Sequence, residues 1–321
     1  MTTRRHLGLG TFFVIWIFGG FSVAIQARAN GELTQHTGNG VQAALISFGS
    51  GFVIISIAMI FSKSMQSGLG RIIASLRDRT LPWWAIPSGI IGGIFVASQS
   101  FSVALIGVAM FSVGIVAGQT LNSLLVDHFG LGPIGRQQIT PRRVLSAVIA
   151  IAAVIVAVSG RLGGGDTRYY AIFLALFAGA AVAVQQALNG RTSAAARQPF
   201  ASTWVAFFFG TAILLLASLV GVLFMGATAQ FPTAGPWWMF LGGIMGVTFI
   251  STASWGVPRL GVLVFALISI AGQLTAGLAL DLFVPVVGTS VTTTLVIGVI
   301  MTLVAVAVGS LQRRAPLNGA C

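Results

Sequence analysis

A six-residue segment of this chain occurs twice, and the repetition decides the fold. Residues 26–31 read Gln-Ala-Arg-Ala-Asn-Gly, and residues 185–190 read Gln-Gln-Ala-Leu-Asn-Gly. In each copy the asparagine is followed 21 residues later by a glycine, Gly51 or Gly210. One short match of this kind carries little weight, so its value depends on further matches in the same order.

Two further motifs recur downstream with the same spacing. Pro-Trp-Trp opens an apolar stretch at residues 82–84 and again at residues 236–238. In both copies a glutamine follows the first tryptophan by 36 residues, and an aspartate follows that glutamine by 8 residues. The matched residues are Trp83, Gln119 and Asp127 in the first copy and Trp237, Gln273 and Asp281 in the second. Shared apolar composition does not produce ordered matches of this kind, so we predict a genuine duplication.

The composition places both copies in a lipid bilayer. Of the 321 residues, 56% are hydrophobic and only 7% are charged, whereas a soluble domain carries about 25% charge. Ten apolar stretches are each long enough to cross a hydrocarbon core of about 30 Å as a helix. They occupy residues 11–29, 41–62, 83–102, 105–126, 143–160, 169–189, 201–225, 237–256, 261–284 and 290–311. The alternating polarity of barrel strands is not visible, so the predicted class is an all-α polytopic membrane protein.

The span count determines how the two copies are oriented. Five spans per copy make the second copy enter the membrane from the opposite side, so the repeats are predicted to be inverted. With the N-terminus in the cytoplasm, 14 of the 17 basic residues fall on the cytoplasmic side, as the positive-inside rule requires. We therefore predict ten transmembrane helices in two inverted five-helix repeats, residues 1–160 and 161–321, with both termini cytoplasmic.

The charge balance and the scarce functional side chains exclude several classes of protein. The net charge of +12 is explained by cytoplasmic loops facing anionic lipid, so no nucleic-acid partner is expected. The only lysine, Lys63, lies in no Walker A pattern, which excludes ATP-driven transport by this chain alone. The three histidines lie in loops or at span margins, so no metal or haem site is predicted. No catalytic set can be assembled, and we predict neither an enzyme nor a cofactor.

The duplicated plan is similar to that of the drug/metabolite transporter superfamily, and the sequence resembles the YdcZ-like family of bacterial inner-membrane exporters. Residues 26–31 and 185–190 carry the resemblance, together with residues 118–127, which run from Gly-Gln to an aspartate. Residues 127–130 read Asp-His-Phe-Gly, whereas residues 281–284 read Asp-Leu-Phe-Val, so a symmetric role for the two aspartates is not implied. The resemblance implies transport and a bacterial inner-membrane location, and it says little about the cargo.

Polar side chains within the predicted spans are the candidate lining of a central substrate site. A carboxamide in hydrocarbon is costly unless it is bonded, so these side chains are expected to face the bundle interior. Gln119 and Gln273 lie near mid-membrane on matched spans and are the preferred pair. The complete set of substrate-binding candidates is Gln26, Asn30, Gln99, Gln119, Asn122, Gln185, Asn189, Ser254, Trp255 and Gln273. The alternative role for the amides is hydrogen bonding between helices.

Charged and aromatic residues near the span ends receive separate predictions. Asp127 and Asp281 are candidates for ion coupling, the alternative being interfacial carboxylates without a special task. Arg28 is predicted to reach outward to solvent, the alternative being binding of an anionic group, and Glu32 is predicted to be a solvated loop charge. The tryptophans that follow the two prolines are predicted to anchor at the headgroup level. Residues 64–80 are predicted to form either a surface helix or a plain loop.

These observations predict a secondary active transporter, more specifically an exporter, of a small neutral or amphipathic metabolite or drug. Alternating access between the two halves is the expected mechanism. A non-transporting membrane scaffold or subunit and a passive channel are the alternatives. The expected partners are the small-molecule substrate and the lipid bilayer, and the sequence leaves the oligomeric state open, with a homodimer among the alternatives.

Overall fold

The computed structural model describes residues 10, 14–133, 135–136, 138–160, 165–228, 231–260, 262–286 and 289–310. All regular secondary structure within these residues is helical, and no β-strand occurs among them. The predicted all-α class is therefore confirmed.

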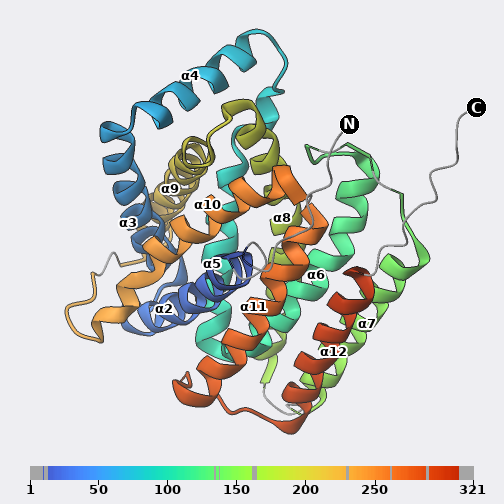
Figure 1. The fold of residues 1–321 in the computed structure, drawn as a ribbon. Helices are drawn as coiled ribbons and strands as arrows, with labels where there is room; N and C mark the ends of the chain where they lie inside the picture. Colours follow the sequence, from blue (N-terminus) through green and yellow to red (C-terminus); the bar gives the residue numbers. More distant parts are fainter. Residues whose placement is uncertain are drawn as a thin grey trace, which may run out of the picture.

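In the first half, a π-helix continues directly as an α-helix at Ser22 (Figure 1). Local sequence explains where α2 ends and α3 begins. Gly38 ends α2 in the left-handed conformation, with a φ of 65°. Asn39 caps the start of α3, because its Oδ1 accepts a hydrogen bond from Val41 N at 2.9 Å. The elements are η1 (Ile15–Phe21), α2 (Ser22–Thr37), α3 (Gly40–Phe61), α4 (Lys63–Arg77), η2 (Trp83–Ala85), α5 (Ser88–Ile106), α6 (Val108–Phe129) and α7 (Pro141–Ser159).

The second half contains the elements α8 (Gly165–Ala196), α9 (Pro199–Phe224), η3 (Trp237–Leu241), α10 (Gly242–Leu260), α11 (Val262–Phe283) and α12 (Thr293–Ser310). In the described part of the chain, seven helices are long and apolar enough to cross a membrane. They are α3, Trp83–Ile106, α6, α7, Tyr169–Ala196, α9 and Trp237–Leu260, and two shorter apolar helices are Ile268–Phe283 and Thr293–Gly309. The protein is therefore a multi-pass membrane protein.

Nine of the ten predicted spans overlap these helices, although some boundaries were wrong. The first predicted span, at residues 11–29, overlaps η1 and α2, and its residues 11–13 lie outside the described part of the chain. The continuous helical segment of η1 and α2 reaches Thr37, past the predicted end at residue 29, and α8 ends at Ala196 rather than at residue 189. The turn between α5 and α6 falls at Gly107, a few residues after the predicted gap. Gly107 has a φ of 80°, which suits glycine and allows α6 to start directly after α5.

α4 (Lys63–Arg77) shows that most of the segment 64–80 forms a surface helix rather than a plain loop, with a turn after Arg77. Met65, Gly68 and Ile72 are buried, at the spacing of one helix face. Arg71 Nε donates to the carbonyl oxygen of Ala196 at 2.6 Å, which ties α4 to the end of α8. In Figure 1 this helix lies at one end of the molecule, away from the central helices.

Helices from the two halves pack against one another rather than forming two separate bundles. α6 packs along α8, and α11 packs along η1. α5 contacts α8 and α9, while α10 contacts α2 and α3. α7 and α12 form a pair at the side of the molecule (Figure 1). The centre of the bundle is consequently enclosed by helices of both halves.

Candidate functional site

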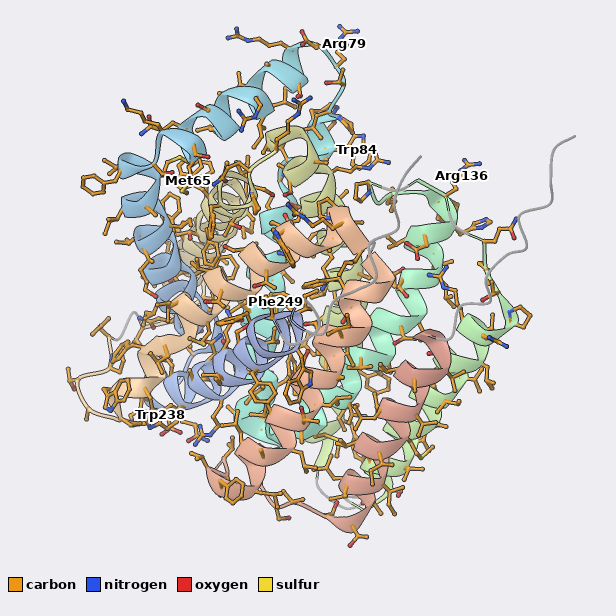
Figure 2. All side chains as sticks on the ribbon, viewed as in Figure 1. Met65, Arg79, Trp84, Arg136, Trp238 and Phe249 are labelled. Atoms are coloured by element: carbon orange, nitrogen blue, oxygen red, sulfur yellow. The ribbon has the colours of Figure 1, made fainter. Side chains whose placement is uncertain are left out.

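A small cavity lies in the middle of the bundle, between α2, α5, α6, α8, α10 and α11. Its volume is about 10 Å³, roughly what a single water needs. Figure 2 shows Phe249, one of its lining residues, near the centre of the molecule. The residues that line the cavity are Val23, Phe95, Ile115, Gln119, Val182, Gln186, Phe249, Ser269, Ile270 and Gln273. In this structure the cavity thus has room for about one water molecule.

Much of this lining comes from matched positions in the two sequence copies. The offset that relates Gln119 to Gln273 also relates Phe95 to Phe249, and all four residues line the cavity. The offset that relates Asn30 to Asn189 brings a further matched pair, Val23 and Val182. Both halves therefore contribute an amide, an aromatic ring and an aliphatic side chain.

The cavity is neutral and offers amide groups. None of the described lining residues is charged. Gln119 Nε2 donates to Gln186 Oε1 at 3.1 Å, and Gln273 Nε2 donates to Ser112 Oγ at 3.2 Å. A glutamine amide has two N–H donors and an oxygen with two lone pairs, so each of these side chains has bonding capacity beyond that bond. The arrangement suits a ligand that combines hydrogen-bonding groups with an apolar surface.

Several other predicted site residues bond neighbouring helices instead of lining the cavity. Asn30 Nδ2 donates to Gln99 Oε1 at 3.1 Å and links α2 to α5. Ser88 Oγ donates to Asn189 Oδ1 at 2.6 Å and links α5 to α8. These contacts correspond to the interhelical role, which was the alternative for the amides.

Gln26 and Gln185 are also buried outside the cavity lining. A Cβ added at Gly246 would lie 2.7 Å from Gln26 Nε2, and one added at Gly92 would overlap Gln185 Nε2. The two glutamines therefore occupy matched places against glycines of α10 and α5.

The remaining predicted residues likewise lie outside the cavity lining. Asn122 Nδ2 donates to the carbonyl oxygen of Ala180 at 2.6 Å, across the α6–α8 contact. Ser254 is buried. Trp255 is half-buried, and the guanidinium carbon of Arg259 lies 4.9 Å from its ring centroid. Of the predicted set, the structure thus brings only Gln119 and Gln273 together at the cavity.

The two matched aspartates are buried near the ends of their helices, and each has a partner. Asp281 accepts hydrogen bonds from Val108 N at 3.0 Å and Ala109 N at 2.8 Å, the first two residues of α6. Asp127 forms an ion pair with Arg143 of α7. A helix N-terminus and a guanidinium both stabilise a buried carboxylate. The two aspartates therefore have different structural roles despite their matched positions.

Replacing Asp281 by asparagine is expected to destabilise the protein by about 2 kcal/mol, because one of two backbone donors then faces an amide N–H instead of a carboxylate oxygen. Thermal unfolding of the purified protein in detergent measures this change. The matched control is Asp78→Asn, since Asp78 is exposed at the end of α4. Equal effects of the two substitutions would contradict the assigned role.

Arg28 and Glu32 correct two predictions made for the outer end of α2. The Arg28 side chain is 7% exposed and that of Glu32 is 14% exposed, so the predictions of an outward-reaching arginine and a solvated loop charge were wrong. Arg28 Nη1 lies 2.8 Å from Glu32 Oε2, and Arg28 Nε donates to the carbonyl oxygen of Val284 at 2.8 Å. Partners of this kind are what a buried guanidinium requires.

Gln186 is the amide of the cavity that sequence reasoning missed. Its counterpart in the first copy is Ala27, so the repeat directs attention to the matched pair Gln26 and Gln185 instead. The signal that was available is the pair of adjacent glutamines at 185 and 186, because successive residues of a helix face different directions. Phe95 and Phe249 were missed as well, although their matched positions were visible in the repeat.

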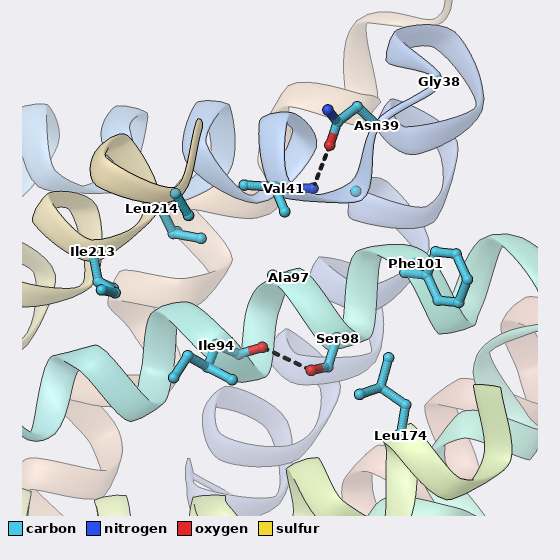
Figure 3. A pocket seen from close by; sticks show the side chains of 12 residues that line it. Gly38, Asn39, Val41, Ile94, Ala97, Ser98, Phe101, Leu174, Ile213 and Leu214 are labelled. Carbon is cyan, nitrogen blue, oxygen red and sulfur yellow. Dashed lines mark hydrogen bonds between the residues drawn. The ribbon is translucent and has the colours of Figure 1, made fainter. Parts of the chain in front are cut away.

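A larger groove of about 540 Å³ lies to one side of α5, against the start of α3 and parts of α8 and α9 (Figure 3). Its described lining contains two polar side chains, Asn39 and Ser98. Both already bond to backbone atoms, Asn39 Oδ1 to Val41 N and Ser98 Oγ to the carbonyl oxygen of Ile94 at 2.8 Å. The groove therefore offers little for polar recognition, and the central cavity is the stronger candidate site.

Comparison with known proteins gives a family for the chain. The family model described as "Putative inner membrane exporter, YdcZ" matches residues 11–156 and 170–308. The inner membrane protein YdcZ of Escherichia coli (strain K12) is 25% identical over 113 residues, which cover 35% of this chain and 72% of that protein. A solved crystal structure of another protein shares the fold, with a TM-score of 0.58 and 19% identity over 94% of this chain and 95% of that chain. Because this family model matches most of the chain's length, the chain belongs to the YdcZ family of inner membrane proteins.

Proposed function

We propose that this protein is a secondary active exporter that carries a small neutral or amphipathic metabolite or drug across the inner membrane by alternating access. The observation that carries the proposal is the central cavity, lined from both halves by Gln119, Gln273 and their matched neighbours. A site between two halves can be exposed to either face by rocking one half against the other. Its membership of a family described as inner membrane exporters supports export as the direction of transport.

The proposal includes ten spans arranged as two inverted five-helix repeats, residues 1–160 and 161–321. The family model matches the two halves as separate segments. The matched part of YdcZ is 72% of that protein but 35% of this chain, so the relative is about half as long. The packing of α6 on α8 corresponds to that of α11 on η1. All three observations are expected of a duplicated five-helix unit.

Cytoplasmic termini are the orientation that we propose. Figure 2 shows Arg79 and Arg136 at the same end of the molecule as Trp84, with Trp238 near the other end. Both arginines belong to segments that the positive-inside rule assigns to the cytoplasm. Their common location supports an orientation in which the α4 end of the bundle faces inward.

The chemistry of the cavity supports a neutral substrate. Amides of Gln119, Gln186 and Gln273 supply donors and acceptors, while Phe95 and Phe249 supply apolar faces. A charged substrate would be desolvated there without a described countercharge in the lining. Asp127 and Asp281 do not line the cavity and have structural partners, so the proposal assigns no ion coupling to them.

Replacing Gln119 or Gln273 by alanine is expected to lower transport efficiency roughly 3- to 10-fold, the loss equivalent to one hydrogen bond. A thermal-shift screen of the purified protein against a metabolite and drug library first identifies a stabilising ligand. Its flux in proteoliposomes is then measured for each variant.

The matched control is Gln138→Ala, which removes an exposed amide outside the cavity lining. Unchanged flux in both cavity variants would remove Gln119 and Gln273 from the site. Flux that does not saturate with ligand concentration would indicate a passive channel instead of a secondary active exporter.

A further inference from the structure

Arg28 of α2 holds the end of α11 at one end of the molecule. Its Nε donates to the carbonyl oxygen of Val284 at 2.8 Å, and its Nη2 donates to that of Pro285 at 3.3 Å. The guanidinium carbon lies 4.7 Å from the ring centroid of Trp238 in η3. Carbonyl groups at a helix C-terminus lack intrahelical donors and carry partial negative charge, so a guanidinium satisfies them well.

Arg191 of α8 binds the corresponding carbonyls and tryptophan at the end of α6, whereas Arg28 additionally forms an ion pair with Glu32. Arg191 Nε donates to the carbonyl oxygen of Leu131 at 2.6 Å, and its Nη2 donates to that of Gly130 at 2.7 Å. The guanidinium carbon of Arg191 lies 5.6 Å from the ring centroid of Trp84 in η2. Two separate arginines thus each bind two consecutive carbonyls and a tryptophan.

The partners of the two arginines occupy matched positions in the sequence copies. The offset that relates Gln119 to Gln273 relates Trp84 to Trp238 and also relates Gly130 and Leu131 to Val284 and Pro285. We call Arg28 with its partners the outer clamp and Arg191 with its partners the inner clamp. Figure 2 shows the two tryptophans toward opposite ends of the bundle. Each clamp joins residues on the two sides of the predicted boundary at residue 160.

The arginines themselves do not occupy matched positions. The offset that relates Asn30 to Asn189 places Ala187 at the position of Arg28 and Glu32 at the position of Arg191. The same contacts are therefore reached from places one helical turn apart. Duplication of the sequence alone does not explain this, which indicates that the contact itself is required at both ends.

We propose that Arg28 and Arg191 are the gating residues of this transporter. The outer clamp closes the central cavity toward the outside, the inner clamp closes it toward the cytoplasm, and each transport cycle releases one clamp at a time. This inference rests on the proposed function. The structure, with both clamps formed and a central cavity of about 10 Å³, corresponds to the closed intermediate of such a cycle.

The clamps act on the helices that line the cavity. The outer clamp holds the end of α11, which carries Gln273, and the inner clamp holds the end of α6, which carries Gln119. Release of a clamp frees that helix end to move away from the helix that bears the arginine. Opening toward one face thereby moves one of the two lining glutamines, which links access to ligand binding.

The test measures access to the cavity from each side of the membrane. Cys321, the only cysteine, is replaced by Cys321→Ser, and Ser269→Cys places a reporter in the cavity lining. A membrane-impermeant maleimide is applied to right-side-out and to inside-out vesicles containing the full-length protein. Arg28→Gln is expected to raise labelling from the outside by roughly tenfold, and Arg191→Gln from the inside by a similar factor, because a closed state loses charge-assisted bonds.

Two controls separate gating from a loosened fold. Ser146→Cys reports on the α7–α12 contact, where Ser146 Oγ donates to the carbonyl oxygen of Ala305 at 2.6 Å, and its labelling is expected to stay low in both variants. Arg28→Lys and Arg191→Lys keep the charge but lose the planar fork, so they are expected to give the same sidedness with smaller increases. If a glutamine variant does not accumulate in the membrane, the labelling is measured on the corresponding lysine variant instead.

Unchanged labelling at position 269, or an equal rise from both faces, would overturn the inference. An equal rise at position 146 would overturn it too, because the arginines would then hold the fold rather than a gate. The labelling requires no transported solute, so failure of the proposed exporter function can be distinguished from failure of the gating role. If Arg28→Gln raises labelling only from the outside and Arg191→Gln only from the inside, but no flux is found, the gating role stands and the exporter function is rejected. If flux is saturable but labelling at position 269 is unchanged, the exporter function stands and the gating role is rejected.

Discussion

Replacing Arg143 by methionine is expected to destabilise the protein by about 3–5 kcal/mol, because a buried carboxylate then loses its partner. The ion pair joins Arg143 of α7 to Asp127 of α6, and the two side chains are only 9% and 10% exposed. Arg143 Nη1 also donates to the carbonyl oxygen of Gln138 at 3.3 Å. Loss of the arginine leaves Asp127 without a compensating charge at the α6–α7 contact.

The double variant Asp127→Leu/Arg143→Met is expected to recover most of that loss, because two apolar side chains of similar size need no compensation. Equilibrium unfolding of both single variants and the double variant in detergent gives the coupling between the two residues. Arg77→Met is the matched control, since Arg77 is exposed on α4. An Arg143→Met variant as stable as this control would show that the pair contributes nothing to folding.

The all-helical, multi-pass class was predictable from the sequence because hydrocarbon excludes charge and requires about 20 apolar residues for each helical span. The boundaries were less predictable where polar residues continue a helix. Asn30, Gly31 and Glu32 read as the end of a span, yet α2 continues to Thr37. Neighbouring helices supply the missing partners, as Gln99 does for Asn30, and hydropathy contains no information about those neighbours.

The candidate site was predictable only in part, for a similar reason. Gln119 and Gln273 were found because the repeat and their depth in the span both point to them. The roles of Arg28 and Asp281 depend on partners 256 and 173 residues away in the chain. A charge near the end of a span reads as interfacial unless those partners are known, so burial of these two residues required the structure.

Gly118→Ala is expected to destabilise the protein by about 3 kcal/mol, at the upper end for overpacking, because backbone rather than a flexible side chain opposes the new methyl group. A Cβ at Gly118 in α6 would overlap the carbonyl oxygen of Leu176 in α8 and lie 3.0 Å from Ala180 N. From the other side, a Cβ at Gly179 would overlap the carbonyl oxygen of Ile115. The two helices cross at this pair of glycines, close in sequence to the cavity-lining residues Gln119 and Val182.

The matched crossing of α11 and η1 extends the same prediction to Gly272→Ala. A Cβ at Gly272 would overlap the carbonyl oxygen of Trp16, and one at Gly20 would lie 2.5 Å from the carbonyl oxygen of Ser269. Gly49→Ala is the control, since nothing lies within 4 Å of its added Cβ, and alanine there is expected to stabilise α3 by up to about 1 kcal/mol. Thermal unfolding in detergent compares the three variants. If alanine destabilises the protein at Gly118 and Gly272 but stabilises it at Gly49, the close approach of the helices rather than helix propensity explains the glycines at the crossings. A Gly118→Ala variant that is more stable than the original protein would reject the crossing geometry.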